Sequence, residues 1–503
     1  MEVVESEAMA ALSDGGTSQA VDGLYCGQFQ SGQGPLLDVV DPSDGRAFAQ
    51  VRTASPGQIA DTIGAARSAF DSGVWSGLPI AERAAYLRRM LQRMEGQSAR
   101  LLDLLVREAG VVRGSMTRPI HVDVALRHGF QCIDLALTLP EAVDNPIPIA
   151  ERATPNYLLE SFQRYEPVGV VAAISAYNVP LFIGLWKIIP ALITGNTVIL
   201  RPSPLTPLAT LLIGEAASAA GLPDGVLNIV AEAGNDGAVL LSTDRRIDMV
   251  TFTGSSAVGK QVIRQSADTM KRYQLELGGK SAQIYLPDAL ELAAGAADRV
   301  CGVQSGQGCV LGTRIFVPAA EKAALLDRMA QSVGKMTVGP AEGADTVVGP
   351  VINAAAVERC EAIVAAAIAA GGRVVAGGRR PAHLTEGFYF EPTILDVPDN
   401  SNPAAQEEIF GPVVCVIGYD NLDHAVAMAN DTQYGLSGHV FGKDMKAAMD
   451  VALRLRTGTV NINGGMISAY ASSGGRKLSG FGRERGVEGI RIYQEIKCIS
   501  ITR

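Results

Sequence analysis

The sequence predicts a large α/β protein whose central unit is an open, mostly parallel sheet of the doubly wound type. From residue 168 to residue 277, β-branched runs alternate with apolar helical segments, which is typical of consecutive βαβ units. A glycine-containing turn at residues 254–259 follows one strand and opens a helix, as nucleotide-binding turns do. The 503 residues include 55 glycines and are 47% hydrophobic, which allows two or three domains with many tight turns.

The N-terminal part is expected to be a flexible tail followed by helices. Residues 1–20 are small, polar and acidic, and they predict an unstructured tail. Residues 41–45 read Asp-Pro-Ser-Asp-Gly and predict a turn between two short strands. Apolar residues at helical spacing then predict helices from Pro56 and Glu82, with further helix between residues 98 and 139.

Two sets of alternating strands and helices follow an extended arm at residues 157–166. The first set has strands near 168–175, 197–200, 226–230 and 250–253, and helices near 186–193, 209–220 and from 257. The second set starts near residue 278, with extended pieces at 315–318, 374–378, 392–395, 408–414 and 460–462. The apolar segment 490–501 predicts a final strand, whose edge requires a partner.

Composition and charge exclude several classes of function. The net charge of −9, with acids and bases interspersed, argues against binding to nucleic acid or to an anionic membrane. No apolar run approaches the ~20 residues that span a bilayer, and the N-terminus lacks the features of a signal peptide. Seven scattered cysteines and five dispersed histidines predict neither disulfides nor a metal site. A reduced, cytoplasmic enzyme is therefore expected.

One cysteine stands out because of the residues around it. Cys309 follows Gly306 and Gly308 and precedes the expected core strand at 315–318, so a glycine-permitted segment can present it to a cleft. The alternative is that Cys309 is a small buried hydrophobe, as free cysteines usually are. Glu276, just before Gly278 and Gly279, would make a thiol and carboxylate pair with it if the fold brings the two together.

The turn at Gly254, Ser255 and Gly259 is a candidate site for a pyrophosphate. Helix N-terminal amides and glycine access provide such a site, although only two glycines are present and the G-x-G-x-x-G fingerprint is absent. An ordinary strand-to-helix turn remains the alternative. Arg201, directly after the strand near 197–200, supports the nucleotide interpretation because a cation there suits a ribose or phosphate.

Together these motifs resemble the aldehyde dehydrogenase superfamily from about residue 22 to the end of the sequence. By this resemblance Cys309 matches the catalytic cysteine and Glu276 the general base. Asn178, in Tyr-Asn-Val-Pro, matches the oxyanion-hole asparagine, and Lys187 matches the active-site lysine. The resemblance implies an aldehyde dehydrogenase-like fold with a Rossmann-type coenzyme domain, a second α/β catalytic domain and a β-strand oligomerisation arm.

The resemblance also implies domain bounds and coenzyme contacts. The coenzyme-binding domain is expected at 21–145 and 168–277, the catalytic domain at 278–478, and the arm with the C-terminal segment at 146–167 and 479–503. The residues expected to bind the coenzyme are Ser175, Ala176, Tyr177, Arg201, Ser203, Pro204, Gly254, Ser255, Val258, Gly259, Leu277, Gly278, Glu408 and Phe410.

Some positions depart from the family pattern. Tyr177 stands where tryptophan is usual, Gln304 where asparagine is usual, and residues 472–475 read Ser-Ser-Gly-Gly rather than Pro-Phe-Gly-Gly. Residues 201–204 read Arg-Pro-Ser-Pro rather than Lys-Pro-Ser-Glu, so the carboxylate that commonly repels a 2′-phosphate is missing. NAD is still the expected main coenzyme, with NADP use possible, because Arg201 suits ribose hydroxyls as well as a phosphate.

The expected reaction is oxidation of an aldehyde to its carboxylic acid through a thiohemiacetal and a thioester on Cys309. An acylating enzyme that uses coenzyme A is disfavoured by Glu276, since such relatives generally lack this base. An enzyme of the glyceraldehyde-phosphate type follows a different chain plan. A catalytically idle binding or structural relative is the remaining alternative, against which the joint presence of Cys309, Glu276 and Asn178 argues.

The substrate is expected to be an apolar, medium-chain or aromatic aldehyde. Residues adjacent to the matched catalytic positions are mostly apolar, and no arginine is evidently placed among them, although they also suit an ordinary core. These expected pocket residues are Val179, Ile183, Trp186, Gly308, Val310, Met466 and Ile467. Strands 157–166 and 490–501 have no obvious partner in their own domain, which predicts a homodimer or homotetramer, with a simple intradomain edge as the alternative.

Overall fold

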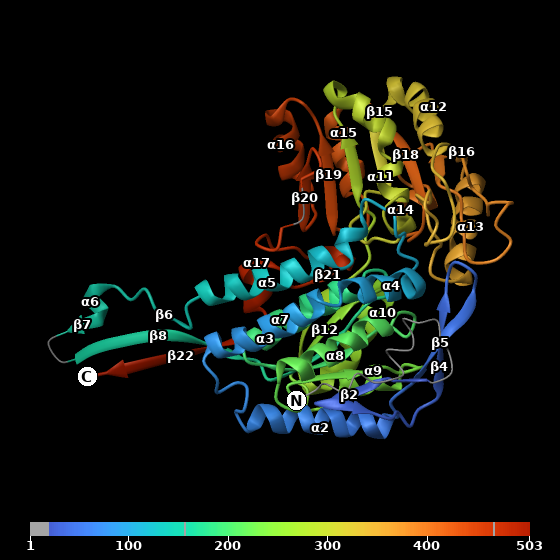
Figure 1. The fold of residues 1–503 in the computed structure, drawn as a ribbon. Coiled ribbons are helices and arrows are strands. Elements are labelled where there is room, and N and C mark those ends of the chain that lie inside the picture. The colour runs from blue at the N-terminus through green and yellow to red at the C-terminus, as the bar shows by residue number, and fades with distance from the viewer. Residues whose placement is uncertain (1–19, 155–156, 466–467) are drawn as a thin grey trace.

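A computed structural model describes residues 20–154, 157–465 and 468–503 as two α/β units and a projecting arm. In Figure 1 one sheet with its helices lies in the lower half, the second lies above it, and the arm extends to the left. Residues 1–19, where most of the flexible tail was predicted, lie outside the described part. No helix among the described residues is both long enough and apolar enough to cross a membrane.

The lower unit contains an eight-stranded sheet in the order β21-β13-β12-β9-β10-β11-β2-β3. Its short outer strands are β21 (Gly480–Phe481), β2 (Leu24–Cys26) and β3 (Gln28–Gln30). Its parallel strands are β9 (Val170–Ile174), β10 (Thr197–Arg201), β11 (Leu227–Val230), β12 (Met249–Thr253) and β13 (Arg272–Glu276). The chain runs from β9 outward to β10 and β11, then returns to place β12 on the other side of β9. Such a reversal opens a ligand crevice at the carboxyl ends of the strands, and it confirms the predicted doubly wound plan.

Helices connect these strands, three of them as the sequence predicted and a fourth, α9, that it did not. They are α7 (Pro180–Ile193), α8 (Leu208–Ala220), α9 (Asp236–Thr243) and α10 (Ser256–Ser266). The N-terminal helices are α2 (Pro56–Asp71), α3 (Ile80–Glu95), α4 (Ser98–Ala109) and α5 (Asp123–Thr138), and the turn at 41–45 joins β4 (Leu36–Asp41) to β5 (Arg46–Arg52). The helical stretch expected at 98–139 is broken after α4, because Gly110 adopts φ 66° and ends that helix.

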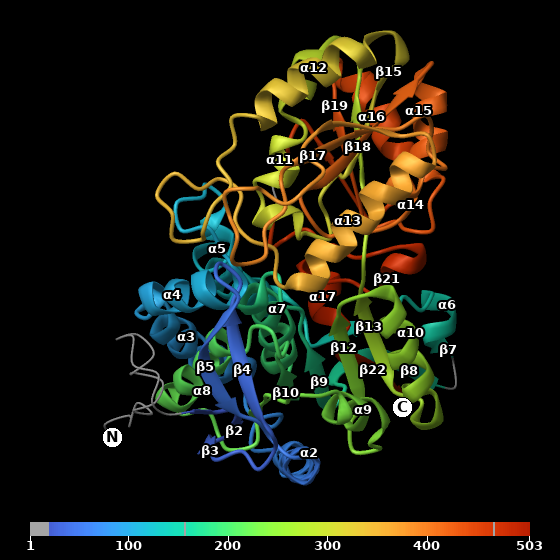
Figure 2. The same cartoon turned by 90° about the vertical axis from the view of Figure 1, so that its right-hand side faces the viewer.

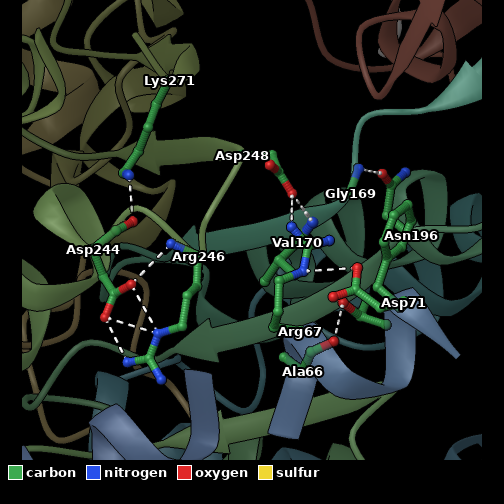
Figure 3. Close-up of polar contacts among 12 residues, drawn as sticks. Ala66, Arg67, Asp71, Gly169, Val170, Asn196, Asp244, Arg246, Asp248 and Lys271 are labelled. Atoms are coloured by element: carbon green, nitrogen blue, oxygen red, sulfur yellow. Dashed lines mark hydrogen bonds and ion pairs between the residues drawn. The ribbon is translucent and has the colours of Figure 1, made fainter. Parts of the chain in front are cut away.

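Polar side chains bind the opposite, amino-terminal ends of these strands together (Figure 3). One carboxylate oxygen of Asp248, before β12, accepts hydrogen bonds from the Val170 amide at 2.7 Å and from Arg67 Nη1 of α2 at 3.0 Å. Asn196, before β10, accepts from the Gly169 amide at 2.9 Å. The amino end of the sheet is therefore closed by structural contacts, which leaves its carboxyl end for ligands.

The upper unit contains a seven-stranded sheet in the order β16-β17-β18-β15-β14-β19-β20. Its strands are β14 (Ala282–Tyr285), β15 (Arg314–Pro318), β16 (Arg373–Ala376), β17 (Thr393–Asp396), β18 (Val413–Tyr419), β19 (Ser437–Phe441) and β20 (Thr459–Ile462). All pairs are parallel except β16 with β17. The second α/β set is confirmed, although β18 begins at Val413 and leaves Glu408 and Phe410 in the preceding loop.

Helices lie beside this upper sheet in Figures 1 and 2. They are α11 (Asp298–Cys301), α12 (Lys322–Val333), α13 (Ala354–Ala369), α14 (Pro403–Gln406), α15 (Leu422–Asn430) and α16 (Met445–Arg454). The core between α13, α15, α16 and the sheet is apolar, with Phe316, Phe390 and Ile417 each fully buried. Such burial explains why the strands of this set read as short continuous apolar runs.

The arm is built from β6 (Ala142–Asp144), β7 (Ala153–Thr154), β8 (Tyr157–Pro167) and β22 (Gln494–Thr502). Strand β22 pairs antiparallel with β8 from Gln494 opposite Pro167 to Thr502 opposite Leu159. The sequence showed no obvious partner for these segments in their own domain, and that interpretation was wrong, because each pairs with the other in the same chain. The predicted strand also begins later, since residues 490 and 491 end helix α17 (Gly486–Arg491).

A buried carboxylate joins two of the helices that flank the lower sheet. Glu108 of α4 is fully buried, and its two oxygens accept the amides of Leu208 at 2.7 Å and Ala209 at 2.9 Å. These amides begin α8, whose N-terminal side-chain cap is missing. Burial raises the pKa of Glu108 to about 8, against the opposing effect of the two amides. The carboxyl group supplies the capping acceptors that α8 otherwise lacks.

We predict that Glu108→Gln lowers the stability of the protein by about 1–3 kcal/mol, because an amide NH₂ then faces a backbone N–H in a buried site. The melting temperature should fall, and calorimetry at one fixed protein concentration measures it. Glu95→Gln, at an exposed position on α3, is the matched control and should melt like the unmodified protein. Equal melting temperatures for both variants would contradict the capping role.

Candidate active site

Cys309 lies half-buried in the loop that leads into β15. Three consecutive residues of this loop have positive φ angles, which are 46° at Gln304, 52° at Ser305 and 76° at Gly306. Only Gly306 is free of a Cβ penalty in that region, and a Cβ there would lie 2.0 Å from the Gly411 carbonyl oxygen. The loop is therefore a strained, tightly seated turn of the kind found at functional sites.

Side chains of the same loop anchor it to several other segments. Gln304 Nε2 donates to the Ala109 carbonyl at 2.6 Å, and Ser305 Oγ donates to the Gly349 carbonyl at 2.8 Å. Gln307 Oε1 accepts from the amide of Ile352 at 3.0 Å. These bonds fix the backbone on the N-terminal side of Cys309, and they give Gln304, which replaces the usual family asparagine, a structural role.

The structure brings Glu276 and Cys309 to one place, which the sequence alone did not show. Glu276 is the last residue of β13, and Gly278 and Gly279 follow it. A Cβ on Gly279 would lie 2.4 Å from the Cys309 carbonyl oxygen, so this backbone packs directly on the cysteine loop. The charge of Glu276 also helps to raise the pKa of the Cys309 thiol, which places the carboxylate within electrostatic reach.

The environment of Glu276 favours its protonated form. Its Oε1 atom is buried and makes no hydrogen bond with any described residue. Burial raises the pKa of Glu276 well above the usual range, and the nearby Glu484 raises it further. Lys187, Arg483 and Arg485 act in the opposite direction. A buried carboxyl group of this kind has the character of an acid or base in a reaction.

Lys187 is part of a buried ion pair rather than a free cation. The Lys187 side chain is fully buried in α7, and its Nζ donates to Glu484 Oε1 at 2.9 Å and to Thr251 Oγ1 at 3.0 Å. Sequence reasoning missed Glu484, which precedes α17. The only signal was the charged triplet at residues 483–485 between two glycines, and nothing in the sequence showed that its central acid is buried.

Asn178 lies beside the cysteine loop at the carboxyl end of β9. It is 4% exposed, and its Nδ2 donates to the Gln307 carbonyl at 2.9 Å. A side-chain amide carries two N–H donors, so one remains for another acceptor. Asn178 therefore reaches the backbone two residues before Cys309 and keeps one N–H donor for a further acceptor.

The thiol of Cys309 is strongly disfavoured as an anion in this environment. Burial is the largest cause, and the charges of Glu408, Glu276 and Glu484 add to it, so that the pKa rises to about 12. The thiolate is the reactive species, and little of it exists at neutral pH with such a pKa. Removal of the thiol proton must therefore be assisted by a nearby base.

The predicted pyrophosphate turn opens helix α10. Ser255 is the N-cap residue, with its Oγ accepting the Val258 amide at 3.3 Å, and Val258 itself is 42% exposed. A Cβ on Gly259 would lie 2.7 Å from the Leu277 side chain, so the glycine permits close contact between α10 and the end of β13. The N-terminus of α10 stands beside the catalytic candidates and suits an anion.

Glu408 and Phe410 lie in the loop before β18, and Glu408 contacts the Gly278–Gly279 turn. Glu408 Oε1 accepts the Gly279 amide at 2.9 Å, and a Cβ on Gly278 would lie 2.1 Å from Glu408 Oε2. Phe410 has φ 55° and meets Tyr177 edge to face, with ring centroids 5.9 Å apart. Tyr177, which replaces the usual tryptophan, thus provides an aromatic wall opposite Phe410.

Polar groups at the carboxyl ends of β9, β10 and β12 fit a nucleotide. Ser175 Oγ and Thr253 Oγ1 are buried and make no hydrogen bond with described residues. Ala176 and Pro204 are half-buried, whereas Ser203 is buried and its Oγ accepts the Leu205 amide at 3.3 Å. Unsatisfied buried hydroxyls beside a helix N-terminus indicate a place for a polar ligand.

Among the predicted substrate residues that the structure describes, Trp186 alone lines the cavity between α5, α7 and α17. This cavity is small, about 20 Å³ in volume, and its walls include His128, Cys132, Leu185 and Arg485. Val179 and Ile183 pack in or on the core, Gly308 adjoins Leu311, and Val310 is 36% exposed. The predicted residues Met466 and Ile467 lie outside the described residues.

Aromatic rings fill one side of this cavity. Trp186 stacks with His128 at 5.9 Å between ring centroids and contacts Phe182 at 4.0 Å. The Arg485 guanidinium lies 4.9 Å from the Trp186 ring centroid. Sequence reasoning found no arginine near the pocket, and Arg485 was missed because it comes from the distant segment before α17.

A doubly wound sheet with a helix N-terminus at its carboxyl edge is the arrangement of a nucleotide-binding enzyme. The sequence model of the aldehyde dehydrogenase family matches residues 29–499. The chain belongs to the aldehyde dehydrogenase family, and the predicted resemblance and fold class are confirmed.

Named relatives and solved structures agree with this assignment. Geranial dehydrogenase of Castellaniella defragrans is 36% identical and aligns with 87% of this chain and 89% of its own. Betaine aldehyde dehydrogenase of Bacillus subtilis is 33% identical and aligns with 92% of this chain and 94% of its own. Among solved structures, a variant of Pseudomonas syringae aldehyde dehydrogenase C with NAD+ and octanal has a TM-score of 0.89, 35% identity and coverage of 95% and 96%. Staphylococcus aureus betaine aldehyde dehydrogenase with NAD+ has a TM-score of 0.91, 33% identity and coverage of 98% and 97%.

We predict that alkylation of Cys309 by iodoacetamide in the coenzyme-free protein accelerates about tenfold per pH unit up to pH 10, without a plateau. The raised pKa keeps the thiol protonated throughout this range, and only the thiolate reacts. Peptide mass spectrometry at timed intervals measures the rate at Cys309 separately from the other cysteines. A short cysteine peptide, which should level off near its pKa of about 8.5, is the reference. A plateau at Cys309 below pH 9 would contradict the burial effect.

Proposed function

We propose that the protein oxidises an aldehyde to its carboxylic acid through a thiohemiacetal and then a thioester on Cys309. The observation that supports this most directly is the packing of the Gly278–Gly279 turn on the Cys309 carbonyl, which joins the candidate nucleophile to the candidate base. Membership of the aldehyde dehydrogenase family gives the general reaction. The arrangement of Cys309, Glu276 and Asn178 supports the particular course proposed here.

In the first step Cys309 attacks the aldehyde. As Sγ bonds to the carbonyl carbon, the thiol proton passes to a neighbouring carboxylate and from there to solvent, with Glu408 as the candidate because its charge has the largest effect of the three nearby acids on the thiol pKa. The carbonyl oxygen becomes an anion, and the free N–H of Asn178 Nδ2 and the Cys309 amide are the candidate donors. In other enzymes one donor of this kind contributes roughly 3–4 kcal/mol to the barrier.

The coenzyme is NAD, which fits the residues at the carboxyl edge of the lower sheet. When bound, NAD would accept a hydride from the carbon attached to Cys309, which oxidises that carbon to the level of a thioester. The α10 N-terminus at Gly254 and Ser255 suits the pyrophosphate, and Glu408 and Phe410 suit the nicotinamide end. We retain the division into a coenzyme-binding domain at 21–145 and 168–277 and a catalytic domain at 278–478.

In the last step Glu276 removes a proton from water, and the resulting hydroxide attacks the thioester carbon. The carbon–sulfur bond then breaks, Cys309 leaves as a thiolate, and the acid is released. Lys187 acts through its neighbours as a positioning residue, since its charge lowers the pKa of Glu276 while Glu484 raises it. The raised pKa makes Glu276 a stronger base towards this proton than an ordinary glutamate.

We propose an apolar, medium-chain or aromatic aldehyde as the substrate. The cavity beside Trp186 is largely apolar, and two relatives, one named for geranial and one solved with octanal, take such aldehydes. Other relatives are named for betaine aldehyde, which is a quaternary cation. Here the Arg485 guanidinium already covers the Trp186 face, so a second cation would meet a like charge at that ring.

The arm suggests a homo-oligomer, either a dimer or a tetramer. It carries exposed apolar side chains, including Tyr157 at 44% and Ile496 at 62% exposure. A narrow strand ribbon with an apolar surface is marginally stable alone, and a second subunit would cover it. A reduced cytoplasmic location is also proposed, because all seven cysteines are free.

We expect Glu276→Gln to lower the steady-state rate by at least a hundredfold while leaving a rapid burst of reduced coenzyme. The amide cannot deprotonate the hydrolytic water, so the acyl-enzyme accumulates. Stopped-flow absorbance and intact-protein mass spectrometry measure the burst and the adduct. Cys309→Ala is the control and should show neither, although it still binds NAD. Disappearance of both burst and adduct in the glutamine variant would reject a role mainly in hydrolysis.

The specificity constant should be at least tenfold higher for octanal or benzaldehyde than for betaine aldehyde. Each buried methylene favours binding by about 0.8 kcal/mol, and Arg485 opposes the quaternary cation. Initial rates with each aldehyde at saturating NAD provide the comparison. The idea fails if betaine aldehyde is preferred. A higher constant for succinic semialdehyde would also overturn it and would assign Arg485 as the partner of the second carboxylate.

Light scattering should report a mass of at least twice the 52.7 kDa chain. Ile496→Glu places a charge on the exposed surface of β22 and should shift the population towards monomer, because the charge would have to be buried in the contact. Leu453→Glu is the matched control, since Leu453 is a 78% exposed residue on α16, away from the arm. A monomer mass for the unmodified protein at all concentrations would reject the oligomer.

A further inference from the structure

Arg201 is held by a carboxylate that sequence reasoning did not identify. Arg201 ends β10, and its Nε donates to Glu232 Oε1 at 2.7 Å. Its Nη2 donates to the Gly234 carbonyl at 2.8 Å and lies 3.5 Å from Asn235 Oδ1. Arg201 is 6% exposed and Glu232 5% exposed, so the ion pair is buried. Arg201 is therefore already paired, whereas the sequence suggested a cation available to a ligand.

Glu232 also occupies the N-terminus of helix α9. Its Oε2 accepts the Gly237 amide at 2.7 Å, and its Oε1 accepts the Ala238 amide at 3.0 Å. Asn235, the formal N-cap residue, makes no side-chain cap. A guanidinium together with the first amides of a helix is a combination that binds phosphate groups in many proteins. Here an internal carboxylate fills that place.

The location of the pair matters for the coenzyme. Arg201 and Glu232 stand at the carboxyl ends of the adjacent parallel strands β10 and β11. In doubly wound dinucleotide folds, the residue that reads the adenosine ribose follows the strand next to the first one, and β10 has that position beside β9. A 2′-phosphate bound there would approach the buried negative charge of Glu232. Arg201 could not pair with it freely, because its guanidinium is already hydrogen-bonded to Glu232.

The hydrogen-bonding capacity that remains on Glu232 favours NAD. An ionised carboxylate has about four acceptor positions, and Arg201, Gly237 and Ala238 use three of those on Glu232. A ribose 2′-hydroxyl can donate to the position that is left, whereas a phosphate dianion has no proton to offer. The nearby Pro204 has no charge that could take over this role.

We propose that Glu232 selects NAD over NADP by holding Arg201 in a buried ion pair and by presenting a carboxylate to the adenosine 2′ position. The inference rests on the proposed use of this edge of the sheet for the coenzyme. Glu232 acts here as an internal substitute for the 2′-phosphate, and it takes over the task of the glutamate that is missing at Pro204.

Equilibrium dissociation constants for NADH and NADPH test the proposal without turnover, by titration of coenzyme fluorescence. The unmodified protein should bind NADH at least tenfold more tightly than NADPH. Glu232→Gln removes the charge and should strengthen NADPH binding at least tenfold, with less than a threefold change for NADH. Adding Arg201→Met to this variant should abolish the gain, because the guanidinium released from Glu232 would be its source. NADPH should also raise the melting temperature of the single variant more than that of the unmodified protein.

Asp236→Asn is the matched control, since Asp236 is an exposed carboxylate on the same helical turn that does not contact Arg201. It should leave the ratio of the two constants unchanged. If Glu232→Gln does not fold, Glu232→Ala serves for the same titration. A ratio that stays within twofold of the unmodified protein in the folded variant overturns the proposal, even when NADH binds well. Failure of the unmodified protein to bind either coenzyme would instead reject the proposed function.

Discussion

The close approach of the Gly278–Gly279 backbone to Cys309 and Glu408 is the contact on which the candidate site depends. A Cβ at Gly278 would lie 2.1 Å from Glu408 Oε2, and one at Gly279 would lie 2.4 Å from the Cys309 carbonyl oxygen. The two glycines therefore allow the end of the lower sheet to touch two loops of the upper sheet without intervening side chains. This contact brings the carboxyl group of Glu276, the thiol of Cys309 and the second acid Glu408 from three distant parts of the sequence into one volume.

The electrostatics of that volume follow from burial more than from any single pair. Cys309, Glu276 and Glu408 all have raised pKa values, and desolvation is the first cause for each. Lys187 offsets part of this effect, but its ammonium group is hydrogen-bonded to Glu484. The nearby acids therefore influence one another's protonation, as the effect of Glu484 on Glu276 shows. Such a set is suited to chemistry in which a proton is taken up in one step and released in another.

Much of the fold was predictable because it depends on local patterns. Short stretches of consecutive residues determine the alternation of strands and helices, the capped start of α10 and the turn before β5. The motifs at Cys309, Glu276 and Asn178 were found for the same reason. In contrast, Glu232, Glu484 and Arg485 act through partners far away in the sequence, and their neighbours do not mark them. The pairing of β8 with β22 was also missed, since residues more than three hundred positions apart form it.

The position of Glu484 in the chain has a consequence for how the protein is made. Glu484 follows nearly every other element in chain order, and β22 comes after it and pairs with β8. Until this segment is in place, the buried ammonium of Lys187 lacks its carboxylate partner and Glu276 lacks its acidic neighbour. During synthesis the earlier helices and strands can collapse first, but the thiol's surroundings are completed only by the last contacts to form. Long-range closure of this kind is a slow folding step, so a nascent chain passes through a stage with its scaffold assembled and its reactive centre still unfinished.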